Sequence, residues 1–312
     1  MRSGADCKPS FEQVLAAWER RKRWIAADTD AYRLLDEAGD GVPEVEIDHY
    51  AGRWVVATRN GKCPDWLKEY DWPGVKAIYW KSLDPSEKLP PRWVCGEQVT
   101  EPFVVRENGL KFEISFQTGY SQGIFLDQRL NRKWVMEHSR GLSVLNCFSY
   151  TCGFGMAAAA GGADRVINLD LSKPYLEWGK RNYHLNGLPV RDQDFIYGDT
   201  FDWLKRFARQ GKKFGGIILD PPTFSRSNKD QKRHVFRAEK DLGELVRVAM
   251  EVLEEGGWMF VSTNCRILTE HRFLRLVEAG MISQAEPEIK VLQMSPEFCG
   301  RNYLKACLAW KI

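Results

Sequence analysis

The stretch 165-RVINLDLSKPYLEWGKRNYHLNG-187 contains a strand and the helix that follows it. Its first residues form a short apolar run that ends at Asp170, and such runs are typical of strands that are buried on both faces. Ser172 is a favourable helix N-cap, and Asn186-Gly187 is a typical helix end. The stretch therefore predicts a buried strand followed at once by a helix.

The same order of strand and helix repeats along the second part of the chain, and this alternation predicts a parallel sheet with helices on both faces. Five such strands are expected at 143-SVLNCF, 165-RVINLD, 194-DFIYGD, 214-FGGIILD and 257-GWMFVS, and an antiparallel pair at 289-IKVLQM and 303-YLKACLAW. We therefore expect residues 119–312 to form a Rossmann-like, doubly wound α/β domain with a mostly parallel, seven-stranded sheet.

Residues 1–118 have a different pattern. A helical spacing of apolar residues over 11–27 is followed by short strand-like pieces. The segment 103-FVVRENGLKFEIS places Asn108-Gly109 between alternating apolar residues, which is the strongest short signal for a β-hairpin. These residues predict a smaller N-terminal α+β domain.

The composition excludes some classes of protein. A formal net charge of +3 is too small to indicate nucleic-acid binding by itself, so the local distribution of charge must carry that argument. None of the eight cysteines forms a C-x-x-C pair and the five histidines show no ligand spacing, so we expect no metal site. No apolar run is long enough to span a membrane and the N-terminus does not resemble a signal peptide, so a cytoplasmic protein is expected.

Polar residues follow the expected strands, where a doubly wound sheet binds its ligand. After the second strand, the Asp170 carboxylate can accept hydrogen bonds from both hydroxyls of a ribose. After the third, Asp199 is expected within reach of an adenine amine. After the first, 146-NCFSYTCGFGMAAAAGG contains small residues that let the backbone turn sharply and approach a ligand closely.

A dinucleotide-binding fold is an alternative, because 153-GFGMAA matches the pattern G-x-G-x-x-A. In dinucleotide folds the first glycine follows the strand almost at once, whereas the residues from Ser149 to Cys152 intervene here. A dehydrogenase also has no use for an Asp-Pro-Pro sequence after its fourth strand. The pattern therefore favours a nucleoside-bearing ligand other than NAD.

The fourth strand ends in Asp220-Pro221-Pro222, which predicts a carboxylate on a stiff ledge because proline fixes φ. Asp220 can hydrogen-bond a base edge or an amino group, and Phe224 can stack on a flipped base. Basic residues follow where substrate phosphates would lie, and the candidates are Arg226, Lys229 and Arg233. The alternative is a proline-terminated strand followed by an ordinary solvated basic loop.

An ordered set of segments over residues 118–312 resembles the class I S-adenosylmethionine-dependent methyltransferases that act on large-subunit ribosomal RNA. The matching segments are 124-IFLDQRLNR, 144-VLNCFSYTCGFG, 170-DLSKPYLEWGKRNYHLNG, 218-ILDPPTFS and 255-EGGWMFVSTNC. The resemblance implies S-adenosylmethionine as cofactor and ribosomal RNA as partner. It implies that the cofactor is contacted by Phe125, Asp127, Arg129, Asn146, Phe148, Ser149, Tyr150, Thr151, Gly153, Asp170, Ser172 and Asp199. On this reading, residues 1–118 help to seat the RNA.

The chain departs from the resemblance at Cys152, where relatives usually have glycine. If the backbone there needs a positive φ, a cysteine costs ~1 kcal/mol or more in strain. Cofactor affinity is then expected to suffer.

The family that the sequence resembles has two branches, which methylate different atoms: C5 of cytosine or N7 of guanine. Cytosine C5 is a poor nucleophile, and enzymes that methylate it use a cysteine thiolate to attack C6. Cys265 lies close to the place of that cysteine but one residue late, and Asn264 occupies the expected position. Guanine N7 already has a lone pair, so binding geometry can suffice. Cys265 is therefore either a nucleophile or a buried structural thiol, and both Asn264 and Cys265 are candidates for completing the catalytic site.

Two other classes of function stay open at this stage. One is a non-catalytic RNA-binding or assembly factor that retains the fold, and the other is a methyltransferase that acts on a protein or a small molecule. A monomer and a homodimer are both compatible with the sequence.

Overall fold

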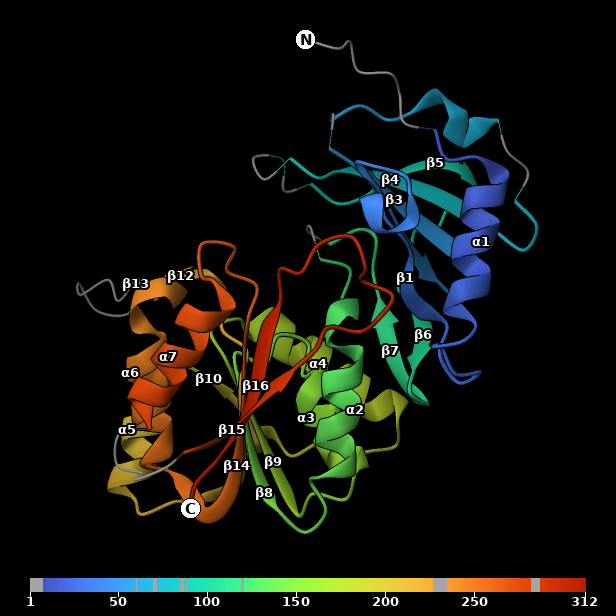
Figure 1. The fold of residues 1–312 in the computed structure, drawn as a ribbon. Helices are drawn as coiled ribbons and strands as arrows, with labels where there is room; N and C mark the ends of the chain where they lie inside the picture. The colour runs from blue at the N-terminus through green and yellow to red at the C-terminus, as the bar shows by residue number, and fades with distance from the viewer. Residues whose placement is uncertain are drawn as a thin grey trace. The chain divides into compact units, whose positions relative to one another are not determined.

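The computed structural model describes residues 8–312 except 60, 70–71, 85–86, 88, 119–120, 227–234 and 282–286. Its contacts divide the chain into two compact units. The first consists of Met1–Arg129 and Ser295–Asn302, and the second of Leu130–Met294 and Tyr303–Ile312. Figure 1 shows the ribbon of both units.

The boundary between the units differs from the one expected after residue 118, and a short late segment belongs to the first unit. Polar contacts explain this. Arg129 makes two hydrogen bonds of 2.8 Å to the Glu297 carboxylate, and Arg21 donates to the Glu297 carbonyl at 2.8 Å. The backbone N–H of Gly300 donates to the carboxylate of Asp36. These partners lie in the first unit, so residues 295–302 fold with it.

The first unit contains a five-stranded sheet in the order β1-β2-β3-β4-β5, in which β3 and β4 are parallel and the other neighbours antiparallel. Helix α1 packs against β1. The bounds are α1 Phe11–Arg21, β1 Ala31–Asp36, β2 Val45–Tyr50, β3 Arg53–Thr58, β4 Ala77–Ser82 and β5 Arg92–Gly96, with 3-10 helices η1 Glu37–Asp40, η2 Asp65–Lys68 and η3 Leu126–Gln128.

The expected hairpin is present as β6 (Phe103–Glu107) and β7 (Leu110–Ile114). Its two turn residues, Asn108 and Gly109, have φ values of 50° and 77°. Two successive positive φ angles are the geometry of the tight turn that an Asn-Gly pair favours, and the prediction is confirmed.

The second unit contains a seven-stranded sheet in the order β10-β9-β8-β11-β14-β16-β15. The pairs among the first five of these strands are parallel, and β16 is antiparallel to both of its neighbours, which confirms the expected sheet. The strands are β8 Ser143–Cys147, β9 Arg165–Asp170, β10 Phe195–Tyr197, β11 Phe214–Leu219, β14 Leu253–Thr263, β15 Glu288–Leu292 and β16 Lys305–Trp310, and a small separate pair is β12 Phe224–Arg226 with β13 Val235–Arg237.

Helices α2, α3 and α4 lie on one face of this sheet, and α5, α6 and α7 lie on the other (Figure 1). Their bounds are α2 Arg129–Glu137, α3 Gly153–Ala160, α4 Lys173–Leu185, α5 Thr200–Arg209, α6 Ala238–Met250 and α7 Glu270–Gly280, and a 3-10 helix η4 spans Asp192–Asp194. Ser172 caps α4 as expected, with its side chain accepting a hydrogen bond from the Tyr175 N–H.

Both faces of the sheet are buried because successive residues of a strand point to opposite sides. Val144 and Ile218 pack with Phe154 of α3, whereas Leu145, the neighbour of Val144, packs in the cluster that contains Leu245 of α6. The near-continuous apolar runs of the sequence therefore reflect a sheet covered on both sides. Within the described part of the chain, the helices are too short or too polar to cross a bilayer.

Candidate active site

Asp170, which ends β9, and Asp220, which follows β11, are two of the acids that the sequence analysis named, and they lie at one edge of the sheet. Leu219, the last residue of β11, is in register with Cys147 of β8 on one side and with Val261 of β14 on the other. Asp220 therefore follows β11 at the level where the β8–α3 loop begins. Strand β9 is the other neighbour of β8 and ends at Asp170. The strand order reverses between β8 and β11, and such a switch point is where open α/β sheets bind their ligands.

The β8–α3 loop turns tightly through three non-glycine residues with left-handed backbone. Phe148, Tyr150 and Cys152 have φ values of 54°, 49° and 62°. The loop is held by hydrogen bonds from the Ser149 N–H to the Leu169 carbonyl (3.1 Å) and from the Cys152 N–H to the Ser149 carbonyl (2.7 Å). The positive φ anticipated at Cys152 is present, so the cysteine carries the strain of a position that suits glycine.

The Asp170 carboxylate is fixed by two backbone donors. One oxygen accepts from the Tyr150 N–H at 2.8 Å and the other from the Ser172 N–H at 2.8 Å. Burial raises the pKa of Asp170 to about 6 although these hydrogen bonds oppose the shift. A carboxylate oxygen has two acceptor positions, so each oxygen can also accept from a ligand hydroxyl.

A chain of buried amides supports the loop from below. Asn146 donates to the Asn168 side-chain oxygen at 2.9 Å, and Asn168 donates to the Tyr183 hydroxyl at 3.0 Å. A Cβ on Gly155 would fall 2.0 Å from the Asn168 oxygen, so the second glycine of the Gly-Phe-Gly sequence lets α3 approach β9. This packing accounts for the match to the dinucleotide pattern without NAD. Asn146 and Thr151 are buried, so their side chains lie in the interior of the unit and not on the surface of the loop.

Asp199 is the N-cap of α5, and its Oδ1 accepts from the Phe201 N–H at 2.9 Å and from the Asp202 N–H at 3.3 Å. The cap orients the carboxylate at the end of β10, next to β9. The sequence-based role at an adenine amine is compatible with this position and stays a prediction.

The Asp-Pro-Pro ledge is tied to the end of β14 by two side-chain hydrogen bonds. The Ser262 hydroxyl donates to Asp220 Oδ1 at 2.5 Å, and the Thr223 hydroxyl donates to Asn264 Oδ1 at 2.9 Å. Phe224 is 44% exposed just beyond the prolines. The structure thus brings Asp220 and Asn264 to the ends of adjacent strands, and it adds Thr223 and Ser262, which the sequence analysis missed.

Cys265 is fully buried and belongs to the apolar cluster beneath α6 and α7. Its N–H donates to the Thr263 hydroxyl at 3.2 Å, and its carbonyl accepts from the Lys305 ammonium at 3.0 Å. The neighbouring Asn264 is exposed. Of the two alternatives for Cys265, the packing favours the structural thiol.

The sequence model of the S-adenosylmethionine-dependent methyltransferase family matches residues 84–300 of the chain. The chain belongs to this methyltransferase family. S-adenosylmethionine is therefore its cofactor, as the resemblance implied, and the fold and the enzyme class are confirmed.

Two curated relatives carry the name Ribosomal RNA large subunit methyltransferase I. The one from Aeromonas salmonicida is 34% identical over 274 residues, which cover 84% of this chain and 68% of the relative. The one from Shewanella denitrificans is 34% identical over 298 residues, which cover 89% of this chain and 74% of the relative. A crystal structure of the methyltransferase SMU.776 in complex with SAH is 28% identical, has a TM-score of 0.84, and matches over 97% of this chain and 82% of that one.

The residues at the strand ends of this methyltransferase fit its cofactor chemically. Asp170 offers acceptor positions for ribose hydroxyls because its orientation is already fixed by backbone donors. The tight turn from Phe148 to Cys152 follows β8 directly and is the second candidate contact. Asp170 and the turn would hold the ribose and the methionine part of the cofactor.

Three predicted cofactor residues belong to the first unit. Phe125 is 42% exposed and precedes η3, and Asp127 lies within η3. Arg129 is buried, and Glu297 engages its guanidinium in two hydrogen bonds. The Arg129 side chain therefore has a structural partner that the sequence did not indicate, and the cofactor role of all three stays a prediction.

The basic candidates after the ledge are only partly described. Arg226 pairs through its backbone with Val235 in the short β12–β13 ladder. Lys229 and Arg233 lie outside the described residues. Their proposed contacts with phosphate stay predictions.

Proposed function

We propose that this enzyme methylates a base of large-subunit ribosomal RNA, and that the base is guanine, with N7 as the acceptor. The observation that carries the proposal is the pair of hydrogen bonds that fix Asp220 and Asn264 at the ends of β11 and β14. The names of the Aeromonas and Shewanella relatives support ribosomal RNA as the substrate.

The ledge presents complementary hydrogen-bonding groups. Because the Thr223 hydroxyl donates to Asn264 Oδ1, the Asn264 NH₂ group is left to donate. The Asp220 carboxylate is an acceptor. Together they suit a base that carries both a carbonyl oxygen and an amino group, and guanine and cytosine have both, whereas adenine lacks the carbonyl and uracil lacks the amino group. The exposed ring of Phe224 can stack on the extruded base.

The burial of Cys265 supports guanine over cytosine as the methylated base. Methylation of cytosine C5 needs a thiolate that reaches C6 of the base, and a thiol in a closed apolar cluster does not reach a substrate. Guanine N7 needs no covalent activation, because its lone pair can attack directly. The guanine alternative therefore agrees with the packing.

The chemistry asked of the protein is mainly orientation. When bound, S-adenosylmethionine supplies an electrophilic methyl group on its sulfonium. Asp220 and Asn264 hold the base edge, and Phe224 holds its plane. The N7 lone pair forms the new bond to carbon as the bond from carbon to sulfur breaks, and no proton leaves the base. A general base is therefore unnecessary.

Mass spectrometry of nucleosides from the large-subunit ribosomal RNA of cells with and without the gene tests the proposal. We expect one 7-methylguanosine to disappear from the RNA of the deletion strain and to return when the gene is restored. Loss of a 5-methylcytidine instead would overturn the choice of base. An unchanged set of modified nucleosides would overturn the substrate.

Calorimetric titration of the purified protein with S-adenosylmethionine measures its affinity for the cofactor. Ribosomal RNA as substrate also implies a cytoplasmic protein. Sedimentation measurements can choose between the monomer and the homodimer.

A further inference from the structure

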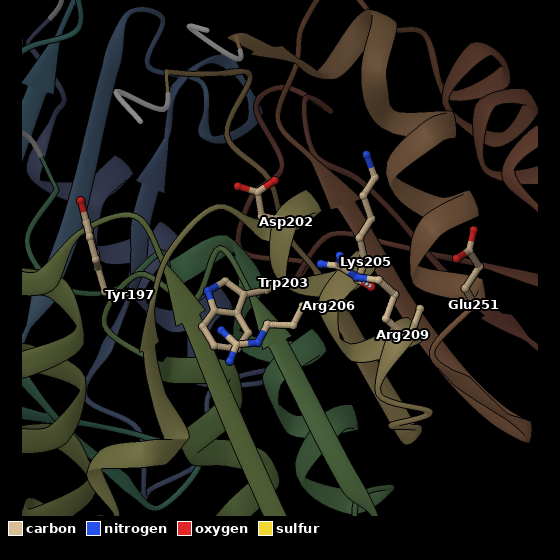
Figure 2. A pocket seen from close by; sticks show the side chains of 8 residues that line it. Tyr197, Asp202, Trp203, Lys205, Arg206, Arg209 and Glu251 are labelled. Carbon is tan, nitrogen blue, oxygen red and sulfur yellow. Dashed lines mark hydrogen bonds between the residues drawn. The ribbon is translucent and has the colours of Figure 1, made fainter. Parts of the chain in front are cut away.

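A second surface feature lies outside the Asp220 ledge. It is a groove of about 590 Å³ along α5, lined by Tyr197, Trp203, Lys205, Arg206 and Arg209 (Figure 2). Tyr197 ends β10 and is in register with Asp170 on β9. The groove therefore starts at the sheet edge that carries the candidate active site and continues along the helix.

Three cations line the groove. Lys205, Arg206 and Arg209 are exposed, and none of them forms an ion pair with any residue that the structure describes. Positions 205 and 209 are neighbours on a helix surface, and 206 lies beside them. The charges are thus grouped on one stretch of α5, where Glu244 attracts Lys205 electrostatically but forms its ion pair with Arg247.

Two carboxylates, those of Asp202 and Glu251, also line the groove, but the groove still has more positive than negative side chains. Glu251 makes a hydrogen bond of 3.0 Å to Arg247, which also pairs with Glu244. Asp202 lies in the first turn of α5, where an acid is favoured by the helix dipole. Neither forms an ion pair with the three cations in the part of the chain that the structure describes.

The Arg206 guanidinium is held in place before any ligand binds. It lies 4.6 Å from the centre of the Trp203 ring, and Figure 2 shows the two side chains against each other. The indole is fixed in turn, because it packs against Phe207 and because its Nε1 would be 2.2 Å from a Cβ on Gly198. A planar guanidinium that is stacked in this way loses little entropy when it binds phosphate.

From this arrangement we propose that the α5 groove binds the phosphodiester backbone of the RNA strand next to the methylated base. The inference rests on the proposed function, since it needs an RNA substrate. Guanidinium groups match phosphate oxygens, and Lys205 adds a further positive charge. Tyr197, which is 47% exposed at the end of β10, offers a ring on which a flanking base can stack.

The test is a charge reversal of the groove, Lys205→Glu with Arg206→Glu and Arg209→Glu. The matched control reverses three exposed cations elsewhere in the second unit, Arg272, Arg275 and Lys290, which likewise form no ion pair with the described residues. The probe is an unmodified transcript of large-subunit ribosomal RNA, and its affinity is measured from 50 to 400 mM salt. A Gln triple variant at 205, 206 and 209 repeats the test without adding negative charge.

We expect the groove variants to bind the transcript at least tenfold more weakly at the lowest salt. The slope of log affinity against log salt should fall by about 2 to 3 for three lost phosphate contacts. The control should keep the wild-type slope, and all variants should bind S-adenosylmethionine as the wild type does. An unchanged slope in the groove variants would overturn the inference. So would normal binding to naked RNA combined with a loss of binding to assembled subunits, which would indicate a protein partner.

The two proposals fail in different ways. If wild-type protein methylates the transcript while the groove variants keep their affinity, only the groove inference is wrong. If wild-type protein binds S-adenosylmethionine but methylates no ribosomal RNA, the proposed function itself is wrong.

Discussion

Gly179 on α4 lies so close to Cys152 that a Cβ at position 179 would fall 2.2 Å from the Cys152 sulfur. Cys152 has the left-handed φ of 62° that favours glycine. The thiol therefore occupies space that is available only because α4 has no side chain at this point. The cysteine and the glycine form a matched pair behind the candidate cofactor loop.

The pair predicts a coupled effect on stability. Gly179→Ala should lower the free energy of unfolding by about 1–3 kcal/mol, because the new methyl group overpacks a closed site. Cys152→Gly removes both the backbone strain and the sulfur, so the double variant should recover about 1–2 kcal/mol relative to the sum of the single changes. Urea unfolding of the four proteins measures this coupling. Strictly additive changes would show that the two residues do not compete for the same space.

Asp170 predicts that cofactor affinity depends on pH. Burial raises the pKa of Asp170 to about 6, above its ordinary value of 3.8, so the folded protein without ligand holds a proton there below pH 6. A ligand that needs the carboxylate must displace that proton, so Kd should rise about tenfold per pH unit below 6 and be flat above it. Titration with S-adenosylhomocysteine from pH 5 to 8 measures this.

The control for this pH dependence is Asp170→Asn, which should bind more weakly at every pH and lose the change of slope near pH 6. A dependence that persists in this variant would assign the proton to another group. The same shift affects folding. Because the folded protein binds the proton more tightly than the unfolded chain, Asp170 should make the protein less stable as pH rises from about 4 to about 6.

Much of the second unit was predictable, since its parallel strands contain short, mostly apolar runs and α4 starts at the recognisable cap Ser172. The parallel register then brings Asp170 and Asp220 to one edge without further information. The strain at Cys152 was considered in advance because relatives in the resembling family usually have glycine there, and glycine suits the positive φ that the structure shows.

The first unit was less predictable because its contacts join residues far apart in the chain. The hairpin was evident from its Asn-Gly turn, but the parallel pairing of β3 with β4 has no local signal. Residues 295–302 belong to the first unit because Glu297 binds Arg129, which lies 168 residues earlier in the sequence. At the candidate site, Thr223 and Ser262 were missed because single hydroxyls next to a ledge carry no pattern until their partners are known.

Thr223 should act as a positioning residue for Asn264. Thr223→Val keeps the shape of the side chain and removes the hydroxyl, so the Asn264 amide is free to turn its oxygen toward the base. We expect kcat/KM for RNA to fall by about tenfold, the size of effect expected for losing one orienting hydrogen bond. Thr223→Ser should restore activity, and neither variant should change cofactor affinity. Equal activity of the Val and Ser variants would show that the Thr223 hydroxyl does not position Asn264.

Asp220→Ala should reduce methyl transfer by about 10²-fold or more, because a positioned polar group at the reacting centre is lost. Cofactor binding should change little, since Asp170 and the β8–α3 loop remain. Ser262→Ala leaves the carboxylate but removes its 2.5 Å hydrogen bond and should give a smaller loss. Single-turnover assays with saturating cofactor measure the chemical step. Full activity of Asp220→Ala would refute the assignment of the ledge.

Cys265 gives the sharpest distinction between the two bases. Its thiol is fully buried in the cluster that contains Leu268 and Phe273, so Cys265→Ala should lower the free energy of unfolding by about 1–2 kcal/mol through lost packing. The folded fraction should still transfer methyl groups within about threefold of wild type, because an N7 acceptor needs no covalent activation. RNA that contains 5-fluorocytosine should form no stable covalent complex with either protein. A complex that forms with wild type and disappears in Cys265→Ala would instead show that the cluster opens, that the thiolate attacks C6, and that cytosine C5 is the atom methylated.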